Sequence, residues 1–181
     1  MDLIRVEVVP DDKDEIARSV RALSERVGPT GWVFTSGGIG PTHDDVSYEA
    51  ISAGLGDKGL ALHEPTRQKM AVHYAAQGKE LNAARLRMAT LPTGCTVHDT
   101  PGAWVPLAQV SNVFILPGVP WLFKLMLDAN KELFRGPALS CATLYTHAGE
   151  GDLADALTKV ADAHPGVTVR ARATLPQLAL R

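Results

Sequence analysis

A glycine-rich stretch followed by two aspartates is the part of this sequence best suited to chemistry. It runs Thr35-Ser36-Gly37-Gly38-Ile39-Gly40-Pro41-Thr42-His43-Asp44-Asp45. Glycines leave the backbone open to a ligand and permit positive φ. Consecutive N–H groups in such a loop can turn inward around an anion. We therefore predict a phosphate-binding loop, with these residues as its ligand contacts: Ser36, Gly37, Gly38, Gly40 and Thr42.

The paired aspartates, Asp44 and Asp45, do not suit direct binding of phosphate, because like charges repel. They suit Mg²⁺ or another divalent metal that bridges carboxylate and phosphate, a common mode of Mg²⁺ binding. We predict both as metal ligands and as the catalytic residues. The alternative is a tight surface turn whose aspartates cap the next helix. His43, between them and the glycines, could touch a phosphate or lie exposed.

The elements on either side of the loop must hold it in place. Trp32 to Thr35 is a short apolar strand, and Ser47 to Leu55 has the pattern of a short helix that Gly56 ends. The positive end of that helix dipole would point at the loop. The segment from Val33 to Gly56 is therefore predicted to be a phosphate-binding strand–loop–helix.

A second loop belongs to the same prediction. Val113 to Leu116 is an uninterrupted apolar strand that ends at Pro117-Gly118-Val119-Pro120. Open α/β sheets place ligands in the crevice beyond the carboxyl ends of their strands. We therefore predict Pro117 and Gly118 as ligand-binding residues. A stiff strand-to-helix turn is the alternative interpretation.

The rest of the chain alternates strands with helices. We expect the following elements: a strand over 3–9, a helix capped by Asp12 and ended by Gly28, a helix over 65–77, turns and short strands over 91–107, and a helix over 121–134. This order predicts a three-layer α/β/α fold with a mostly parallel sheet. A strand over 143–146, a helix over 153–164 and a strand over 167–171 predict a small β-α-β unit, so we expect domains over 1–137 and 138–181.

Composition narrows the functional classes. The 181 residues carry a net charge of −2, which gives no basic field for DNA or RNA, so we expect no nucleic-acid partner. No apolar run approaches the roughly 20 residues that span a bilayer, and the first residues lack a signal-peptide pattern. Two cysteines cannot form a disulfide framework. We expect a soluble protein of the cytoplasm or of an organelle stroma.

The glycine loop closely resembles the signature of the MoaB/Mog molybdopterin-binding family, as does the helix start Asp45-Val46-Ser47-Tyr48-Glu49-Ala50. The form Gly-Pro-Thr-His-Asp-Asp resembles the branch found in FAD synthases and CinA-like proteins. Three more stretches agree with that branch: Leu81 to Pro92 with Arg85, Arg87 and Met88, Val113 to Pro120, and Gly151-Asp152-Leu153-Ala154.

The resemblance implies a function as well as a fold. It places Asp45 at the family's metal-binding aspartate, with Asp44 as its acidic neighbour, and Pro117 to Pro120 at the second ligand-facing loop. It implies a nucleotide or pterin ligand (FAD, ADP-ribose or molybdopterin), metal-dependent hydrolysis of the pyrophosphate of FAD or ADP-ribose, and a homo-oligomer. Molybdopterin binding with adenylylation is one alternative, and a catalytically silent regulatory domain is another.

Departures from the family pattern lead to a further expectation. The family's first strand and helix, with a Gly-Asp-Glu turn and an Asp-x-Asn, have no counterpart ahead of Leu3. At the other end, Arg170 to Pro176 stands where the FAD-synthase branch has Gly-Ser-Tyr-Pro. We therefore expect a chain that is truncated at both ends. Arg85 and Arg87 could reach a phosphate or stay solvated, and we interpret Tyr48, Trp104 and Trp121 as packing residues.

Overall fold

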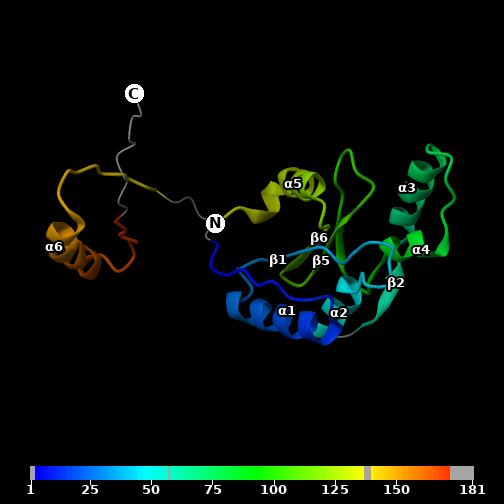
Figure 1. Ribbon diagram of the computed structural model, residues 1–181, viewed down its shortest axis with the longest axis horizontal. Coiled ribbons are helices and arrows are strands. Elements are labelled where there is room, and N and C mark those ends of the chain that lie inside the picture. The colour runs from blue at the N-terminus through cyan, green and yellow to red at the C-terminus, as the bar shows by residue number, and fades with distance from the viewer. Residues whose placement is uncertain (1–2, 57, 137–139, 172–181) are drawn as a thin grey trace, which may run out of the picture. The chain divides into compact units, whose positions relative to one another are not determined.

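The computed structural model describes residues 3–56, 58–136 and 140–171 of the chain. Contacts divide it into two compact units, Met1–Pro137 and Ala138–Arg181 (Figure 1). No helix within the described ranges is long and apolar enough to cross a membrane. Most of the C-terminal stretch where the sequence leaves the family pattern, residues 172–176, lies outside the described residues.

The first unit alternates short strands with helices. Its elements, in chain order, are α1 (Lys13–Val27), β1 (Val33–Ser36), α2 (Ser47–Gly54), β2 (Leu60–Leu62), α3 (Glu64–Ala75), α4 (Ala83–Leu86), η1 (Arg87–Ala89), β3 (Thr90–Pro92), β4 (Thr96–His98), β5 (Leu107–Val110), β6 (Val113–Leu116), α5 (Pro120–Ala129) and η2 (Lys131–Phe134). The predicted helices after Asp12, Val46 and His63 are therefore confirmed within one or two residues.

Four of these strands form one sheet in the order β1-β6-β5-β4, while β2 and β3 pair separately. β1 and β6 are parallel, and the β6–β5 and β5–β4 pairs are antiparallel. The register places Ser36 opposite Leu116, and His98 opposite Leu107. The loops that follow β1, β6 and β4 therefore leave the same edge of the sheet, which we call the loop edge.

Helices cover both faces of this sheet, which confirms the three-layer α/β/α fold. Val113 and Ile115 of β6 pack in one core with Ile16 of α1 and Ile51 of α2. Phe114, Leu116 and Leu107 pack in a second core with Leu122 and Met126 of α5. Figure 1 shows α1 and α2 on one side of the strands and α5 on the other. Successive side chains of β6 point to opposite faces of the sheet, and both faces are covered, so all four of its residues are apolar and buried.

Two local predictions need correction. The helix predicted over 121–134 is broken at Asn130, whose side chain donates a hydrogen bond to the backbone oxygen of Met126 at 2.9 Å. An asparagine side chain competes in this way with the backbone of a helix. The strand predicted over residues 3–9 is wrong, because that segment has no regular secondary structure. Val8 is 94% exposed there, and no described strand offers the segment a ladder of hydrogen bonds.

The second unit contains one of the three elements predicted for it. The helix α6 (Glu150–Ala163) is confirmed, starting three residues before the predicted position. The strands predicted over 143–146 and 167–171 are not formed. Tyr145 is 90% and Val167 60% exposed, so neither segment buries the face that a strand needs. The described part of this unit is therefore a helix with irregular flanking segments.

Candidate functional site

The two glycine-containing loops predicted from the sequence meet at the loop edge. The N–H of Gly37 donates to the oxygen of Leu116 at 3.0 Å, and the hydroxyl of Ser36 donates to the oxygen of Pro117 at 3.3 Å. A Cβ on Gly118 would lie 3.3 Å from the Cα of Gly37. Gly118 therefore needs glycine for the close approach of the loops, and Gly37 needs it for its φ of 105°. The structure brings the predicted residues of the first and second loops into one place.

Ser47, the first residue of α2, fixes the turn at Gly38. Its hydroxyl donates to the oxygen of Gly37 at 2.9 Å, and its N–H donates to the oxygen of Gly38 at 2.9 Å. Gly38 has a φ of 65°, and a Cβ there would lie 2.3 Å from the Ser47 hydroxyl oxygen. This position therefore requires glycine both for its backbone conformation and for space. The signal in the sequence was a serine at the start of the helix, and its role was not predicted.

These hydrogen bonds reduce the number of loop N–H groups that can bind an anion. The N–H groups of Gly37 and Ser47 already donate within the fold, so they do not face a ligand. The amide of Gly40 hydrogen-bonds the carboxylate of Asp45. Within the glycine segment, the amides of Gly38 and Ile39 are therefore the ones left for the predicted nest.

Asp45 has a structural partner, which the sequence did not reveal. One of its oxygens, Oδ2, accepts hydrogen bonds from the N–H of Thr42 at 2.9 Å and from the Thr42 hydroxyl at 2.5 Å. A Cβ on Gly40 would lie 2.5 Å from the same oxygen, so Gly40 makes room for the carboxylate. Thr42 therefore binds Asp45 within the turn, and neither aspartate caps α2, whose N-cap Val46 has no side-chain hydrogen bond.

Both aspartates are held in the charged form. Partial burial would raise the pKa of Asp45, but hydrogen bonds from Thr42 and from the amide of Gly40 outweigh it and lower the pKa. The Thr42 hydroxyl is the main cause that lowers the pKa of the exposed Asp44, and the charge of Arg87 adds to it. The loop therefore carries two carboxylates that stay ionised at neutral pH.

This pair of carboxylates fits a metal only in part. Among the described residues, no group of three or more His, Cys, Asp or Glu side chains is placed to hold a metal ion. Mg²⁺ commonly takes one or two carboxylates and completes its shell with water and substrate phosphate. The Thr42 bonds engage one oxygen of Asp45, and Asp44 is exposed. The two aspartates fit that kind of metal ion, and do not fit one held by protein ligands alone.

A small pocket of about 100 Å³ opens beside Asp45. It is lined by Ile39, Gly40, Asp45, Tyr48, Glu49, Leu60, Arg87 and Thr90. Arg87 crosses to the loop and donates to the backbone oxygen of Asp45 at 3.0 Å. Tyr48 is buried, which raises the pKa of its hydroxyl, and that hydroxyl has no hydrogen-bond partner in the described part of the chain. Arg87 thus belongs to the site, an outcome that the sequence left open.

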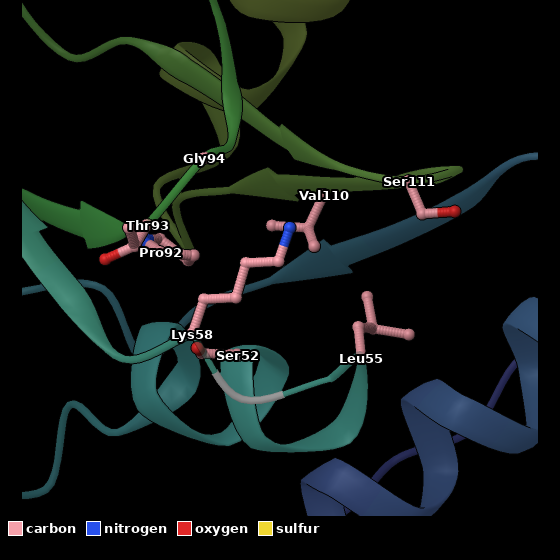
Figure 2. Close-up of a pocket in the computed structure, with 8 residues that line it drawn as sticks. All are labelled: Ser52, Leu55, Lys58, Pro92, Thr93, Gly94, Val110 and Ser111. Carbon is pink, nitrogen blue, oxygen red and sulfur yellow. The ribbon is translucent and has the colours of Figure 1, made fainter.

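A second pocket, of about 190 Å³, lies at the opposite edge of the sheet. Its lining includes Ser111, in the turn between β5 and β6, and Lys58. Figure 2 shows the Lys58 side chain extending across this pocket toward Val110. The register pairs Val110 with Val113 at the start of β6, so this pocket is far from the loops that follow β1 and β6. It is not part of the candidate site.

Comparison with known proteins agrees with the resemblance seen in the motifs. The model of the family described as "Probable molybdopterin binding domain" matches residues 1–135. A CinA-like protein of Escherichia coli (strain SE11) is 31% identical over 99% of this chain and 46% of its own length. A protein of Aeropyrum pernix is 33% identical over 92% of this chain and 64% of its own length. The chain thus spans about half the length of these relatives.

A solved structure supports the same conclusion for the fold. The crystal structure of CinA from Thermoplasma acidophilum, titled as a protein of unknown function, matches with a TM-score of 0.56 and 31% sequence identity. The match covers 67% of this chain and 71% of that chain.

Proposed function

This chain belongs to the molybdopterin-binding domain family, and from that premise we propose that it binds the phosphate of a nucleotide or pterin between its two glycine loops. The observation that carries the proposal is the contact of Gly118 with Gly37, which joins the loop after β6 to the loop after β1. Such a junction at the carboxyl ends of parallel strands is where open α/β sheets bind ligands.

The residues present supply donors for a phosphate group. The amides of Gly38 and Ile39 lie in the glycine segment, and the first turn of α2 contributes the positive end of its dipole. A hydrogen bond from such a donor to a charged group contributes about 1.5–3 kcal/mol. Arg87, which lines the adjacent pocket and bonds the backbone oxygen of Asp45, adds a positive charge beside the loop. Two or three of these contacts together can hold a phosphate in water.

We further propose that Asp44 and Asp45 hold Mg²⁺ or another divalent ion on the bound diphosphate. When bound, the ion would polarise a phosphoryl oxygen and favour hydrolysis of the pyrophosphate of FAD or ADP-ribose. The aspartates contribute their negative charge, and the hydrogen bonds from Thr42 favour that charged form by lowering the pKa of both carboxyls. The neighbouring loop contributes by holding the phosphates in position.

Calorimetric titration of the full chain with pyrophosphate, ADP-ribose and FAD, with and without MgCl₂, tests binding. A ligand at 100 times its Kd should also raise the free energy of unfolding by about 2.7 kcal/mol. Absence of both heat and stabilisation with all three ligands would refute the proposal.

Release of AMP from FAD or ADP-ribose tests hydrolysis separately. Asp45→Asn keeps an oxygen that can accept the Thr42 hydrogen bonds but removes the charge, so we expect a folded protein without metal-dependent turnover. Asp11→Asn, at an exposed aspartate outside the loops, is the matched control. Hydrolysis by Asp45→Asn at the wild-type rate would show that Asp45 is not a catalytic residue.

A second candidate function is binding without hydrolysis. The two hydrogen bonds from Thr42 to Asp45 favour it, because they engage an oxygen that a metal ion would otherwise bind. The family description favours molybdopterin as the ligand in that case. Tight binding of ADP-ribose or molybdopterin, with no product released in the presence of Mg²⁺, would support this function over the hydrolytic one.

A further inference from the structure

Three aromatic rings and an arginine gather on the first unit, outside the residues assigned to the phosphate site. The Trp104 ring lies 5.9 Å from the His73 ring and 6.0 Å from the Tyr74 ring, centroid to centroid. The guanidinium carbon of Arg85 lies over the Tyr74 ring at 4.5 Å. We call these four residues the aromatic cluster. Its members come from α3, α4 and the loop between β4 and β5.

The aromatic cluster lies at the loop edge. β4 ends at His98 and β5 begins opposite it at Leu107, so the connection that carries Trp104 leaves the same edge as the two glycine loops. Arg85 is two residues from Arg87, whose side chain donates to the oxygen of Asp45. Helical residues two apart are separated by only about 3–4 Å along the axis. One short helical segment therefore links the cluster to the phosphate loop.

Packing alone accounts poorly for this arrangement. The core on that side of the sheet has its own aromatic group, in which Phe114 and Phe134 lie 4.9 Å apart. In the aromatic cluster, by contrast, His73 is exposed and the other three residues are half-buried. Partly exposed aromatic side chains beside an anion-binding loop resemble the surfaces on which bases stack in nucleic-acid-binding proteins.

Hydrogen bonds restrict two members of the aromatic cluster, Arg85 and His73. The N–H of Arg85 donates to the side chain of Asn82 at 3.0 Å, which caps α4. The side chain of His73, in α3, lies 2.8 Å from that of Gln77, just beyond the end of the helix. Restricted side chains lose little freedom when a ligand binds against them, which favours binding.

We infer that the aromatic cluster is a stacking surface for the planar heteroaromatic ring of the ligand, with Trp104 as its main contact. The inference rests on the proposed phosphate binding at the glycine loops. It goes further by assigning residues to the ring of such a ligand, which the proposed phosphate site leaves without a contact. Trp104 and Tyr74 are thus specificity-determining residues, and the glycine loops bind the phosphate that such ligands share.

Two probes separate the ring from the phosphate. FMN carries a flat ring and a phosphate, whereas ribose 5-phosphate carries the phosphate without a ring. Their dissociation constants are measured by calorimetry for the wild type, Trp104→Ala, Trp104→Phe and Val72→Ala. Val72 is an exposed residue of the same helix as His73 and Tyr74, and it serves as the control.

We expect Trp104→Ala to weaken FMN binding by about 5- to 150-fold, the range found for removal of a stacking side chain. Its affinity for ribose 5-phosphate should stay at the wild-type value. Trp104→Phe should recover most of the loss for FMN, and Val72→Ala should change neither constant.

Equal losses for both probes in Trp104→Ala, or no loss for either, would overturn the stacking assignment while leaving phosphate binding intact. Equal dissociation constants of the wild type for ribose 5-phosphate and FMN would also overturn the stacking assignment. If the wild type binds neither probe, the proposed phosphate site fails, and the stacking surface fails with it.

Discussion

The Cα of Gly37 lies 3.3 Å from the place that a Cβ on Gly118 would occupy, so the two loops touch through positions that carry no side chain. Neither loop could approach the other this closely with a larger residue at both places. The first prediction concerns this contact directly.

Gly118→Ala should widen the junction of the two loops. The added carbon meets backbone, which cannot rotate away, so one loop must shift by a few tenths of an ångström. We expect affinity for pyrophosphate to fall about tenfold or more, equivalent to one lost hydrogen bond to a charged group. Calorimetry measures the change. Gly136→Ala is the control, because nothing lies within 4 Å of a Cβ there, and an equal loss in that variant would contradict the explanation.

Gly38→Ala should reduce stability more than Gly78→Ala does. The two glycines have nearly equal φ values, 65° and 64°, so both variants have the strain of about 1–2 kcal/mol of a left-handed residue. Only the Cβ at position 38 would meet another side chain, that of Ser47. Overpacking of this kind adds about 1–3 kcal/mol. Urea unfolding measures both variants.

The role of Ser47 can be isolated with a double mutant. In the Ser47→Ala background the hydroxyl oxygen is gone, so Gly38→Ala should be less destabilising there than in the wild type. An unchanged or larger effect would show that the contact with Ser47 is not the cause.

These loop contacts show what the sequence could and could not predict. The turn from Ser36 to Asp45 was predictable as a turn because its glycines, Thr42 and aspartates lie within ten residues, but the bonds from Thr42 to Asp45 within it were not. The approach of Gly118 followed from strand order, since both loops leave parallel neighbours. The contact of Arg87 with Asp45 was not predictable, because α4 and η1, which place Arg87, are only four and three residues long and too short to show apolar periodicity.

The errors have a similar physical origin. The segment over residues 3–9 has the composition of a strand, but composition does not reveal whether a neighbouring strand is present to pair with it. The same holds for residues 143–146 and 167–171. β2, which was missed, is three residues long and depends on its pairing with β3. Pairing is a property of the whole fold, which a local pattern does not encode.

Thr42→Val should make the protein more sensitive to acid. Asp45 has a lowered pKa in the fold, so its contribution to stability is present above the unfolded value of about 3.9 and is lost as pH falls through the folded value. Valine removes the hydroxyl donor, while partial burial continues to raise the pKa. The folded pKa of Asp45 therefore rises, and the midpoint of acid unfolding should move to higher pH. Circular dichroism against pH measures this midpoint.

Thr96→Val is the control for that experiment, because Thr96 is exposed on β4 and no hydrogen bond joins it to an acid among the described residues. The same shift in both variants would mean that the loss of a surface hydroxyl, and not the bond to Asp45, is responsible.

Arg87→Met should raise the pKa of Asp44, whereas Arg85→Met should leave it unchanged. The two arginines lie two residues apart, and each variant removes one positive charge from the same helical segment. The charge of Arg87 is among the causes that lower the pKa of Asp44, after the Thr42 hydroxyl and a backbone hydrogen bond, whereas Arg85 lies over the Tyr74 ring. Methionine keeps the apolar stem of the arginine, so packing changes little. NMR titration of the aspartate carboxyl carbons follows Asp44 directly.

An equal rise of the Asp44 pKa in both variants would indicate a change in overall charge, and no rise in either would show that Arg87 does not act on the loop. The loss of the Arg87 bond to the oxygen of Asp45 should also weaken pyrophosphate binding, so affinity and pKa are expected to change together in Arg87→Met alone.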